Sequence, residues 1–410
     1  MDDEAPAVVG ALDGVRVVEF GMWVAGPAVG AVLADWGASV VKVEPLGGDP
    51  QRALAGVART AEPGLPVNPS FDVTNRGKRS IALDLKSEEG REIALRLVAE
   101  ADVVVTNMRP SALARLGLDH ASLSARHPAL IYGLLTGYGT EGPAKDAPGY
   151  DIGAYWSRSA IAASLTIPGG TPPFQRGAMG DRTAGAALAG GIAAALFARE
   201  RTGRGQLVSA SLFRWGVYTL SSDLSLALHH GRPMDTARRE TMSSPTVNCY
   251  SAADGRWFWL TGLERDRHWP ALVRAVDRPH WLTDPRYATA GARADNAADL
   301  IAELDAVFAS APRADWVTAF VKHDVWHEVL NTVPDLLDDE QLVPSGALAE
   351  VRDESGASTT MVNTPIDFTD TPSLPRASAP ELGAHTDELL LELGYDHDHV
   401  AALRTAGRVV

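Results

Sequence analysis

The sequence predicts an α/β protein with a doubly wound parallel sheet, followed by a smaller α+β domain. Three observations support this prediction. Short β-branched segments alternate with helix-like segments over the first third of the chain. A connector rich in Pro, Ser and Arg then interrupts the pattern. Beyond the connector, a hairpin pattern precedes a run of amphipathic helices.

The expected sheet begins with a strand at Val15–Phe20, and a helix with Pro27 in its first turn follows. The next two strands are expected at Ser39–Glu44 and Arg79–Leu85. Ser87 has the position of an N-cap, because acidic residues and a periodic apolar pattern follow it. Strands that alternate with helices in this way form βαβ units, which place the strands parallel.

Two more strands are expected at Asp102–Met108 and Ala129–Gly137. From about Ile192 to Leu228 the chain is rich in Ala, Ser and Leu, and we expect it to be helical throughout. The segment "YSAADGRWFWLTG" indicates a hairpin with Asp-Gly at its turn, and helices are expected to follow it.

The domain boundaries follow from the connector and from the Pro-rich C-terminal tail. A tail with one amphipathic helix packs back onto an existing core more often than it forms its own. We therefore expect a large domain of residues 1–225 and 345–410, a small domain of residues 245–337, and linkers at 226–244 and 338–344.

The composition excludes several classes of partner. The net charge of −15 argues against non-specific binding to nucleic acids or anionic membranes. No uninterrupted apolar run has the length of a membrane span, and the acidic N-terminus lacks the pattern of a signal peptide. A single cysteine, Cys249, fits a reducing compartment. We expect a cytoplasmic protein with no nucleic-acid or membrane partner.

Gly21, Gly26 and Gly30 follow the first expected strand, as in many nucleotide-binding proteins. Their spacing matches neither G-x-G-x-x-G nor the Walker pattern. Two interpretations stay open. The glycines permit tight packing at a strand–helix turn, or their backbone contacts another phosphate-bearing ligand.

Two other kinds of site find little support. His323 and His327 lie four residues apart on an expected helix, but no third metal ligand is evident nearby. The "YDHDH" segment near the C-terminus is similar, and we predict no metal site. The chain has no G-x-S-x-G elbow, and Cys249 has no His beside it in the sequence.

Basic and acidic residues indicate a more specific site. A set of basic side chains lies on or after the expected strands: Lys78, Arg79, Lys86, Arg109 and Arg115. Ligands of open α/β sheets bind beyond the carboxyl ends of the strands, so this set predicts an anionic ligand. Tyr150 and Asp151 follow the last expected strand, and Asp181 begins an Ala/Gly-rich helix, where it is expected to act as the cap.

Taken together, these segments resemble the family III CoA-transferases, which include formyl-CoA transferase and α-methylacyl-CoA racemase. The matching segments include "LDGVRVVEFGMWVAGPAVGAVLADWGASVVKVEPLGGDPQR", "NRGKRSIALDL", "VVVTNMRPSALARLGLD" and "GDRTAGAALAGGIAAALFARERTGRGQ". The resemblance implies a Rossmann-like large domain built from both chain ends and a smaller domain. It also implies a homodimer whose two chains interlock like linked rings.

The resemblance further implies that CoA and acyl-CoA are substrates, that a carboxylic acid is the acceptor, and that there is no bound cofactor. Asp181 matches the catalytic aspartate of the transferases, and Asp151 and Tyr150 are expected to orient the substrate. By the pattern of the family, CoA contacts Val24, Ala25, Leu83, Lys86, Asn107, Met108, Arg109, Arg115, Ala147 and Tyr150.

Departures from the family pattern narrow the range of expected substrates and reactions. Formyl-CoA transferase has Gln in place of Val24 and Arg in place of Pro45, so an oxalate-type substrate is disfavoured. The racemases have His in place of Tyr150, and a phenol with an ordinary pKa near 10 is a poor base at neutral pH. Transfer is therefore favoured over racemisation.

The resulting hypothesis is that Asp181 forms a mixed anhydride and then an aspartyl-CoA thioester. The helix N-terminus is expected to keep its carboxylate ionised at neutral pH, and the small residues Gly180, Ala184 and Gly185 to make room for the thioester. Two alternatives stay open: exchange of an α-proton on an acyl-CoA, and a non-catalytic CoA-binding protein.

Overall fold

The computed structural model describes residues 10–53, 68–352 and 358–410. The described chain forms two compact units. The first combines the described parts of Met1–Ala163, Phe174–Pro233 and Gln341–Val410, and the second combines Ser164–Pro173 with Met234–Glu340. The sequence-based boundaries differ from these units at Ser164–Pro173, which they place in the large domain.

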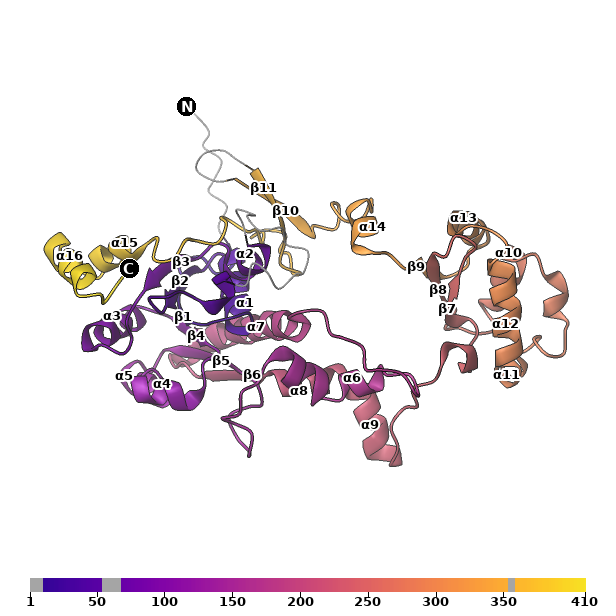
Figure 1. The fold of residues 1–410 in the computed structure, drawn as a ribbon, viewed down its shortest axis with the longest axis horizontal. Coiled ribbons are helices and arrows are strands. Elements are labelled where there is room, and N and C mark those ends of the chain that lie inside the picture. The colour runs from indigo at the N-terminus through magenta and orange to yellow at the C-terminus, as the bar shows by residue number, and fades with distance from the viewer. Residues whose placement is uncertain (1–9, 54–67, 353–357) are drawn as a thin grey trace. The chain divides into compact units, whose positions relative to one another are not determined.

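The first unit is built on a six-stranded parallel sheet, which confirms the predicted α/β class (Figure 1). The strand order is β3-β2-β1-β4-β5-β6, the order of a Rossmann sheet. All five predicted strands are present. The six strands are β1 (Arg16–Phe20), β2 (Ser39–Glu44), β3 (Arg79–Ala82), β4 (Val103–Thr106), β5 (Ile131–Thr136) and β6 (Leu207–Ser211).

The sixth strand corrects the expectation of a helix from about Ile192 to Leu228. The preceding helix ends at Gly203, which has a left-handed backbone with φ of 67°, and β6 then pairs with β5 alone. A Cβ on Gly205 would lie 1.9 Å from the Leu130 carbonyl oxygen, so this position needs glycine. The strand was missed because it is short and lies at the edge of the sheet. Its small and polar residues also resemble those of the helical sequence around it.

Helices cover both faces of the sheet, as expected for strands buried on both sides. Alternate side chains of each strand enter two separate cores: Val17 packs with the first face, and Val18 with the second. The first face carries α1 (Ala25–Asp35) and α7 (Met179–Thr202). The second carries α3 (Glu88–Ala99), α4 (Pro110–Leu116), α5 (His120–Arg126), α15 (Thr386–Glu392) and α16 (His397–Thr405).

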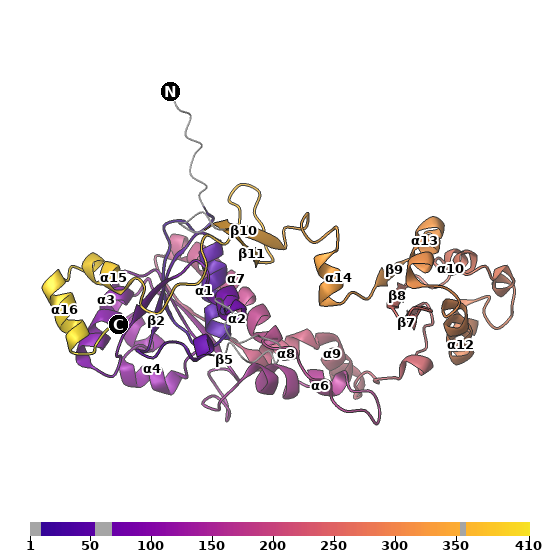
Figure 2. The same ribbon diagram turned by 45° about the horizontal axis from the view of Figure 1, so that its top comes forward.

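The C-terminal segment belongs to this second face, and both views show α15 and α16 beside α3 (Figures 1 and 2). The predicted cap at Ser87 is confirmed, since its hydroxyl accepts a hydrogen bond from the Gly90 N–H at 3.0 Å.

The other elements of this part of the chain are η1 (Pro50–Ala53), α2 (Pro69–Asn75), the π-helix η2 (Ile152–Ser157), α6 (Ile161–Ser164), α8 (Leu212–Thr219), α9 (Ser221–His230), β10 (Leu348–Arg352) and β11 (Ser358–Val362).

The second unit has α+β character. Its antiparallel sheet has the order β7-β8-β9, and the predicted hairpin at Asp254-Gly255 is confirmed between β7 and β8. Aromatic side chains such as Tyr250, Phe258 and Phe308 form its core. The elements are η3 (Arg239–Thr241), β7 (Val247–Ser251), β8 (Trp257–Thr261), α10 (Trp269–Ala275), η4 (Pro279–Leu282), α11 (Ala290–Asp295), α12 (Ala297–Phe308), α13 (Arg313–His323), β9 (His327–Val329) and α14 (Val333–Leu337).

The helix expected to carry both His323 and His327 ends between them. Asp324 has a left-handed backbone, with φ of 59°, and His327 lies in β9. The described residues contain no group of three or more His, Cys, Asp or Glu side chains arranged to hold a metal ion. They also contain no helix of the length and apolarity that a bilayer span requires.

The crossing of α1 and α7 depends on Gly185. A Cβ added there would lie 2.8 Å from the Ala28 Cβ and 3.3 Å from the Ala25 carbonyl oxygen. We expect Gly185→Ala to lower the free energy of unfolding by about 1–3 kcal/mol in denaturant titration, because the two helices must separate. The control is Gly190→Ala in the same helix, where a Cβ meets nothing within 4 Å. It should leave stability unchanged or raise it by up to about 1 kcal/mol, and equal losses in both variants would contradict the packing argument.

Candidate active site

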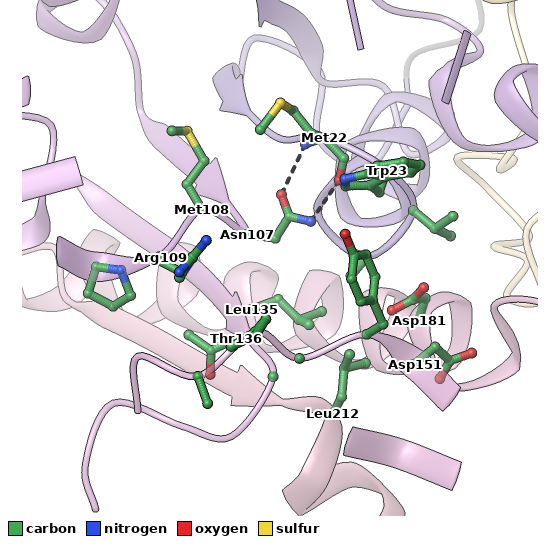
Figure 3. A pocket seen from close by; sticks show the side chains of 18 of the residues that line it. Met22, Trp23, Asn107, Met108, Arg109, Leu135, Thr136, Asp151, Asp181 and Leu212 are labelled. Carbon is green, nitrogen blue, oxygen red and sulfur yellow. Dashed lines mark hydrogen bonds between the residues drawn. The ribbon is translucent and has the colours of Figure 1, made fainter. Parts of the chain in front are cut away.

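A cavity of about 330 Å³ lies at the carboxyl ends of β1, β4 and β5 (Figure 3). This is the edge at which open α/β sheets bind their ligands. The cavity lies within the first unit. Its lining residues are Met22, Trp23, Val24, Ala25, Asn107, Met108, Arg109, Pro110, Ala112, Leu135, Thr136, Gly137, Lys145, Ala147, Pro148, Gly149, Tyr150, Asp151, Asp181 and Leu212.

The loop after β1 forms one wall of the cavity. The Asn107 side chain accepts a hydrogen bond from the Met22 N–H at 3.0 Å and donates one to the Met22 carbonyl oxygen at 2.7 Å (Figure 3). Gly26 permits this approach, because a Cβ there would lie 2.8 Å from the Asn107 Oδ1. Asn107, expected to contact CoA, therefore uses its amide to shape the wall.

Gly30, like Gly26, permits a close approach of a side chain to α1. A Cβ on Gly30 would lie 2.0 Å from the buried Glu19 Oε2, so glycine lets this carboxylate approach the helix. Of the two interpretations left open for the three glycines, tight packing at a strand–helix turn explains both Gly26 and Gly30.

Asp151 ties the loop after β5 to the start of α7. Its side chain is 7% exposed, and its Oδ2 accepts hydrogen bonds from Gln175 Nε2 at 2.9 Å and from the Gly180 N–H at 3.3 Å. Gly180 makes room for it, since a Cβ there would lie 2.3 Å from the Asp151 Oδ1. Asp151 thus places a carboxylate at the positive end of the helix, where it is favourable.

The expectation that Asp181 caps α7 is therefore wrong. The N-cap position is Ala178, which has a left-handed backbone with φ of 62° and makes no side-chain cap hydrogen bond. Asp181 is the third residue of the helix, and the carboxylate that meets the first turn is that of Asp151. Gly180 and Gly185 were expected to leave room for a thioester. Instead, the space beside Gly180 is occupied by Asp151, and the space beside Gly185 by Ala28.

Asp181 lies at the cavity wall beside Asp151 (Figure 3). Among the described residues its carboxylate has no hydrogen-bond partner. Burial, together with the negative charge of Asp151, raises the pKa of Asp181 to about 7, although the Arg182 cation opposes the shift. A group with this pKa is only partly ionised at neutral pH, which argues against the expectation that the helix N-terminus keeps the Asp181 carboxylate ionised there. Burial also raises the pKa of Asp151, against the hydrogen bonds from Gln175 and Gly180.

Aromatic side chains meet at the cavity. Tyr150 is 62% exposed and lies edge-on to Trp23, with 6.1 Å between ring centroids. Trp156, by contrast, is buried in the hydrophobic core and does not line the cavity.

The structure brings most of the predicted residues together. Those that line the cavity are Val24, Ala25, Asn107, Met108, Arg109, Ala147, Tyr150, Asp151 and Asp181. Leu83 is buried, bridges to Val409 and does not line this cavity, so its contact with CoA stays a prediction. Lys86 and Arg115 are exposed and do not line the cavity.

The predicted cluster of basic residues divides between two roles. Lys78 is buried against Glu19, and Arg79 pairs with Glu388 and Glu392, so these two are occupied. Arg109 is exposed at the cavity, at the end away from Asp181 (Figure 3).

Sequence reasoning missed two functional residues of the site. Lys145 lines the cavity, and Gln175 holds Asp151. Lys145 had a signal, because it is a basic residue in the Gly- and Pro-rich loop directly before Tyr150. Gln175 had none, because its role depends on a contact across 24 residues of chain.

Comparisons with known proteins identify the family of this chain. Residues 12–386 match the model of CoA-transferase family III. The chain is 33% identical to (R)-2-hydroxy-4-methylpentanoate CoA-transferase of Clostridioides difficile, over 95% of this chain and 97% of that protein. It is 31% identical to cinnamoyl-CoA:phenyllactate CoA-transferase of Clostridium sporogenes, over 95% of both chains.

A solved structure is similar over nearly the same length. The crystal structure of a CAIB/BAIF family protein from Brucella suis superposes with a TM-score of 0.81 and 33% sequence identity, covering 94% of this chain and 100% of that one. The chain therefore belongs to CoA-transferase family III and is an enzyme of that family.

The raised pKa of Asp181 makes stability depend on pH. A carboxyl group whose pKa is raised on folding destabilises the fold when it ionises. This penalty is absent below the unfolded value of 3.8 and grows as the pH rises to about 7. In Asp181→Asn the penalty is removed. We expect its gain in unfolding free energy to be about 1–2 kcal/mol larger at pH 8.5 than at pH 5, allowing for partial exposure.

Denaturant titrations at the two pH values measure this difference. The control is Asp146→Asn, which changes an exposed carboxylate in the loop before Tyr150. A gain from Asp181→Asn that is the same at both pH values would show that its carboxylate is not destabilised by its surroundings.

Proposed function

We propose that this enzyme moves CoA between carboxylic acids and that the Asp181 carboxylate is the nucleophile. One observation carries the proposal. Asp181 lies at the wall of a cavity at the carboxyl edge of the sheet, without a hydrogen-bond partner among the described residues and with a pKa raised to about 7. A desolvated, unpaired carboxylate is more reactive than one held by hydrogen bonds.

In the first half of the reaction, an Asp181 oxygen attacks the carbonyl carbon of the acyl-CoA thioester. The carbon–sulfur bond breaks, a mixed anhydride remains on Asp181, and CoA leaves as the thiolate. The thiolate then attacks the side-chain carbonyl carbon of Asp181. The anhydride C–O bond breaks, which gives an aspartyl-CoA thioester and releases the first acid as a carboxylate.

The second half reverses these steps with another acid. The acceptor carboxylate attacks the aspartyl thioester, so a new anhydride forms and the thiolate leaves. The thiolate attacks the acceptor carbonyl carbon, which forms the new acyl-CoA and restores the Asp181 carboxylate. The overall reaction exchanges one thioester for another of comparable energy through higher-energy anhydrides, and no proton, oxidant or metal is consumed.

Other cavity residues have supporting roles in this proposal. Arg109 and Lys145 lie exposed at the cavity and are placed to meet the phosphates of CoA. Asp151 holds the first turn of α7 and thereby Asp181. The exposed Tyr150 ring and Trp23 form a surface for pantetheine or the acyl group. Lys86 and Arg115 stay predicted contacts of CoA, although they lie outside this cavity.

For the substrates, we propose acids with apolar side chains. The cavity wall includes Trp23, Val24, Leu135 and Leu212, and two relatives are named for branched and aromatic 2-hydroxy acids or their derivatives. Val24 is not a group that binds a second carboxylate. This composition disfavours an oxalate-type acid as donor or acceptor.

We expect Asp181→Asn to lower transfer activity by about 10³-fold or more, because an amide cannot form the anhydride. Binding of CoA, measured by calorimetry, should change little. Intact-protein mass spectrometry after treatment with acyl-CoA and hydroxylamine should show a hydroxamate in the wild type and none in the variant. Substantial transfer by Asp181→Asn would refute the assignment.

Ionisation of Asp181 should also appear in the kinetics. Attack requires the carboxylate, and the pKa of Asp181 is raised to about 7 by burial and by Asp151. We expect kcat/KM for the acyl-CoA donor to rise about tenfold per pH unit below pH 7 and to level off above it. A profile that is flat between pH 5 and 8 would exclude Asp181 as the group that must ionise.

One observation favours a second candidate function. A carboxyl group with a pKa near neutrality suits a general base, and Asp181 has this property. Exchange of the α-proton of an acyl-CoA is therefore the alternative. Deuterium incorporated from heavy water at the α-carbon, in the absence of an acceptor acid, would identify it.

We also propose the homodimer with interlocked chains that the family resemblance implies. No residue of α9 is buried within the described chain, and Tyr218, Leu224 and Leu228 expose apolar surface around it. Light scattering on the purified protein tests the assembly. A monomeric mass at micromolar concentration would contradict it. The proposed location is the cytoplasm, since a lone cysteine fits a reducing compartment.

A further inference from the structure

The wall of the cavity after β1 is held by side chains from outside the cavity. The Lys42 Nζ donates a hydrogen bond to the Gly21 carbonyl oxygen at 3.0 Å. Asp49 Oδ1 accepts one from the Trp23 N–H, also at 3.0 Å. Met22, which lies between Gly21 and Trp23, is held by the side-chain amide of Asn107. Three consecutive residues of the loop thus have backbone groups bonded to side chains.

Trp23 needs such support because of its backbone. Its φ is 65°, in the left-handed region that bulky residues rarely adopt. This conformation costs about 1–2 kcal/mol for a residue with a Cβ. It persists only where the surroundings over-determine it, and such residues cluster at functional sites.

The support itself is a set of buried charges. Lys42 is fully buried, and its ammonium also contacts Asp49 Oδ2 at 2.9 Å and Glu19 Oε1 at 3.2 Å. The other oxygen of Glu19 accepts from the Lys78 Nζ at 2.7 Å. Burial lowers the pKa of Lys78 to about 8, with Glu19 opposing the shift.

Two carboxylates and two ammonium groups therefore balance one another beneath the loop. Removing one member of a buried ion pair leaves the other uncompensated, at a cost of several kcal/mol. The set is accordingly rigid, and the two loop residues bonded to it inherit that rigidity.

We propose that Asp49, held by Lys42, is a positioning residue for CoA transfer. It fixes the left-handed conformation of Trp23, so that the indole ring and the following Val24–Ala25 backbone form a rigid wall for the acyl-CoA. Asp49 does not line the cavity and acts through Trp23. The inference rests on the proposed function, because it takes acyl-CoA as the ligand.

Asp49→Asn tests this role with little change of shape. We expect the Kd for CoA, measured by calorimetry, to rise about tenfold or more, because misplaced walls weaken binding. At saturating acyl-CoA, trapping of Asp181 by hydroxylamine should stay within about threefold of the wild-type rate. A loss in binding that leaves the chemical step intact distinguishes positioning from general damage.

The matched control is Asp35→Asn. Asp35 is equally buried, pairs with Arg76 at the far end of α1, and does not line the cavity. Its substitution should lower the melting temperature without weakening CoA binding. If both variants lose affinity to the same extent, Asp49 has only a structural role and the proposal is overturned.

A second test addresses the backbone directly. Glycine adopts the left-handed conformation without cost, whereas alanine does not. Adding Asp49→Asn should therefore weaken CoA binding less in a Trp23→Gly background than in a Trp23→Ala background. The same fold-change in Kd in both backgrounds would overturn the proposal.

A wild-type Kd for CoA in the Asp49→Asn variant would also overturn the proposal, while binding of CoA by the wild type would still stand. A wild type that binds no CoA would instead overturn the proposed function, and the inference with it.

Discussion

The contact between Asp151 and the first turn of α7 organises the candidate site. One carboxylate, desolvated between Gln175 and Gly180, joins the loop after β5 to the helix that carries Asp181. It stabilises the helix end, and its negative charge adds to the burial that raises the pKa of Asp181. The same group thus contributes both to the position of the proposed nucleophile and to its raised pKa. Its oxygen lies so close to Gly180 that this residue has no room for a side chain.

The wall formed by the loop after β1 follows the same physical pattern. At both places, buried charged side chains form hydrogen bonds to backbone atoms that border the cavity. Lys42 and Asp49 hold the loop after β1, as Asp151 holds the start of α7. Strained residues lie at both places, Trp23 on one side and Ala178 on the other. Rigid walls of this kind suit a site that has to hold CoA while CoA is transferred from one carboxylic acid to another.

The sequence predicted the fold where the pattern was strong and local. Alternating strands and helices gave five of the six strands, and the cap at Ser87 was correct. Edge strand β6 was missed because its sequence resembles a helix. Asp181 was found, but its environment was not. A cap is a local property, whereas the contact of Asp151 with Gly180 joins residues 29 positions apart. The bridge of Leu83 to Val409 could not be predicted locally either, because it joins the third strand to the C-terminal segment.

The raised pKa of Asp181 has a consequence for the proposed chemistry. The free carboxylate is disfavoured next to Asp151 in a partly desolvated wall, and a shift of one pKa unit corresponds to about 1.4 kcal/mol. An anhydride or a thioester on the same side chain carries no charge. In the proposed mechanism, acylation of Asp181 therefore relieves a repulsion that the folded protein imposes on the resting enzyme. The arrangement that costs stability in the free protein thus favours the proposed covalent intermediates and couples their formation to the electrostatics of Asp151.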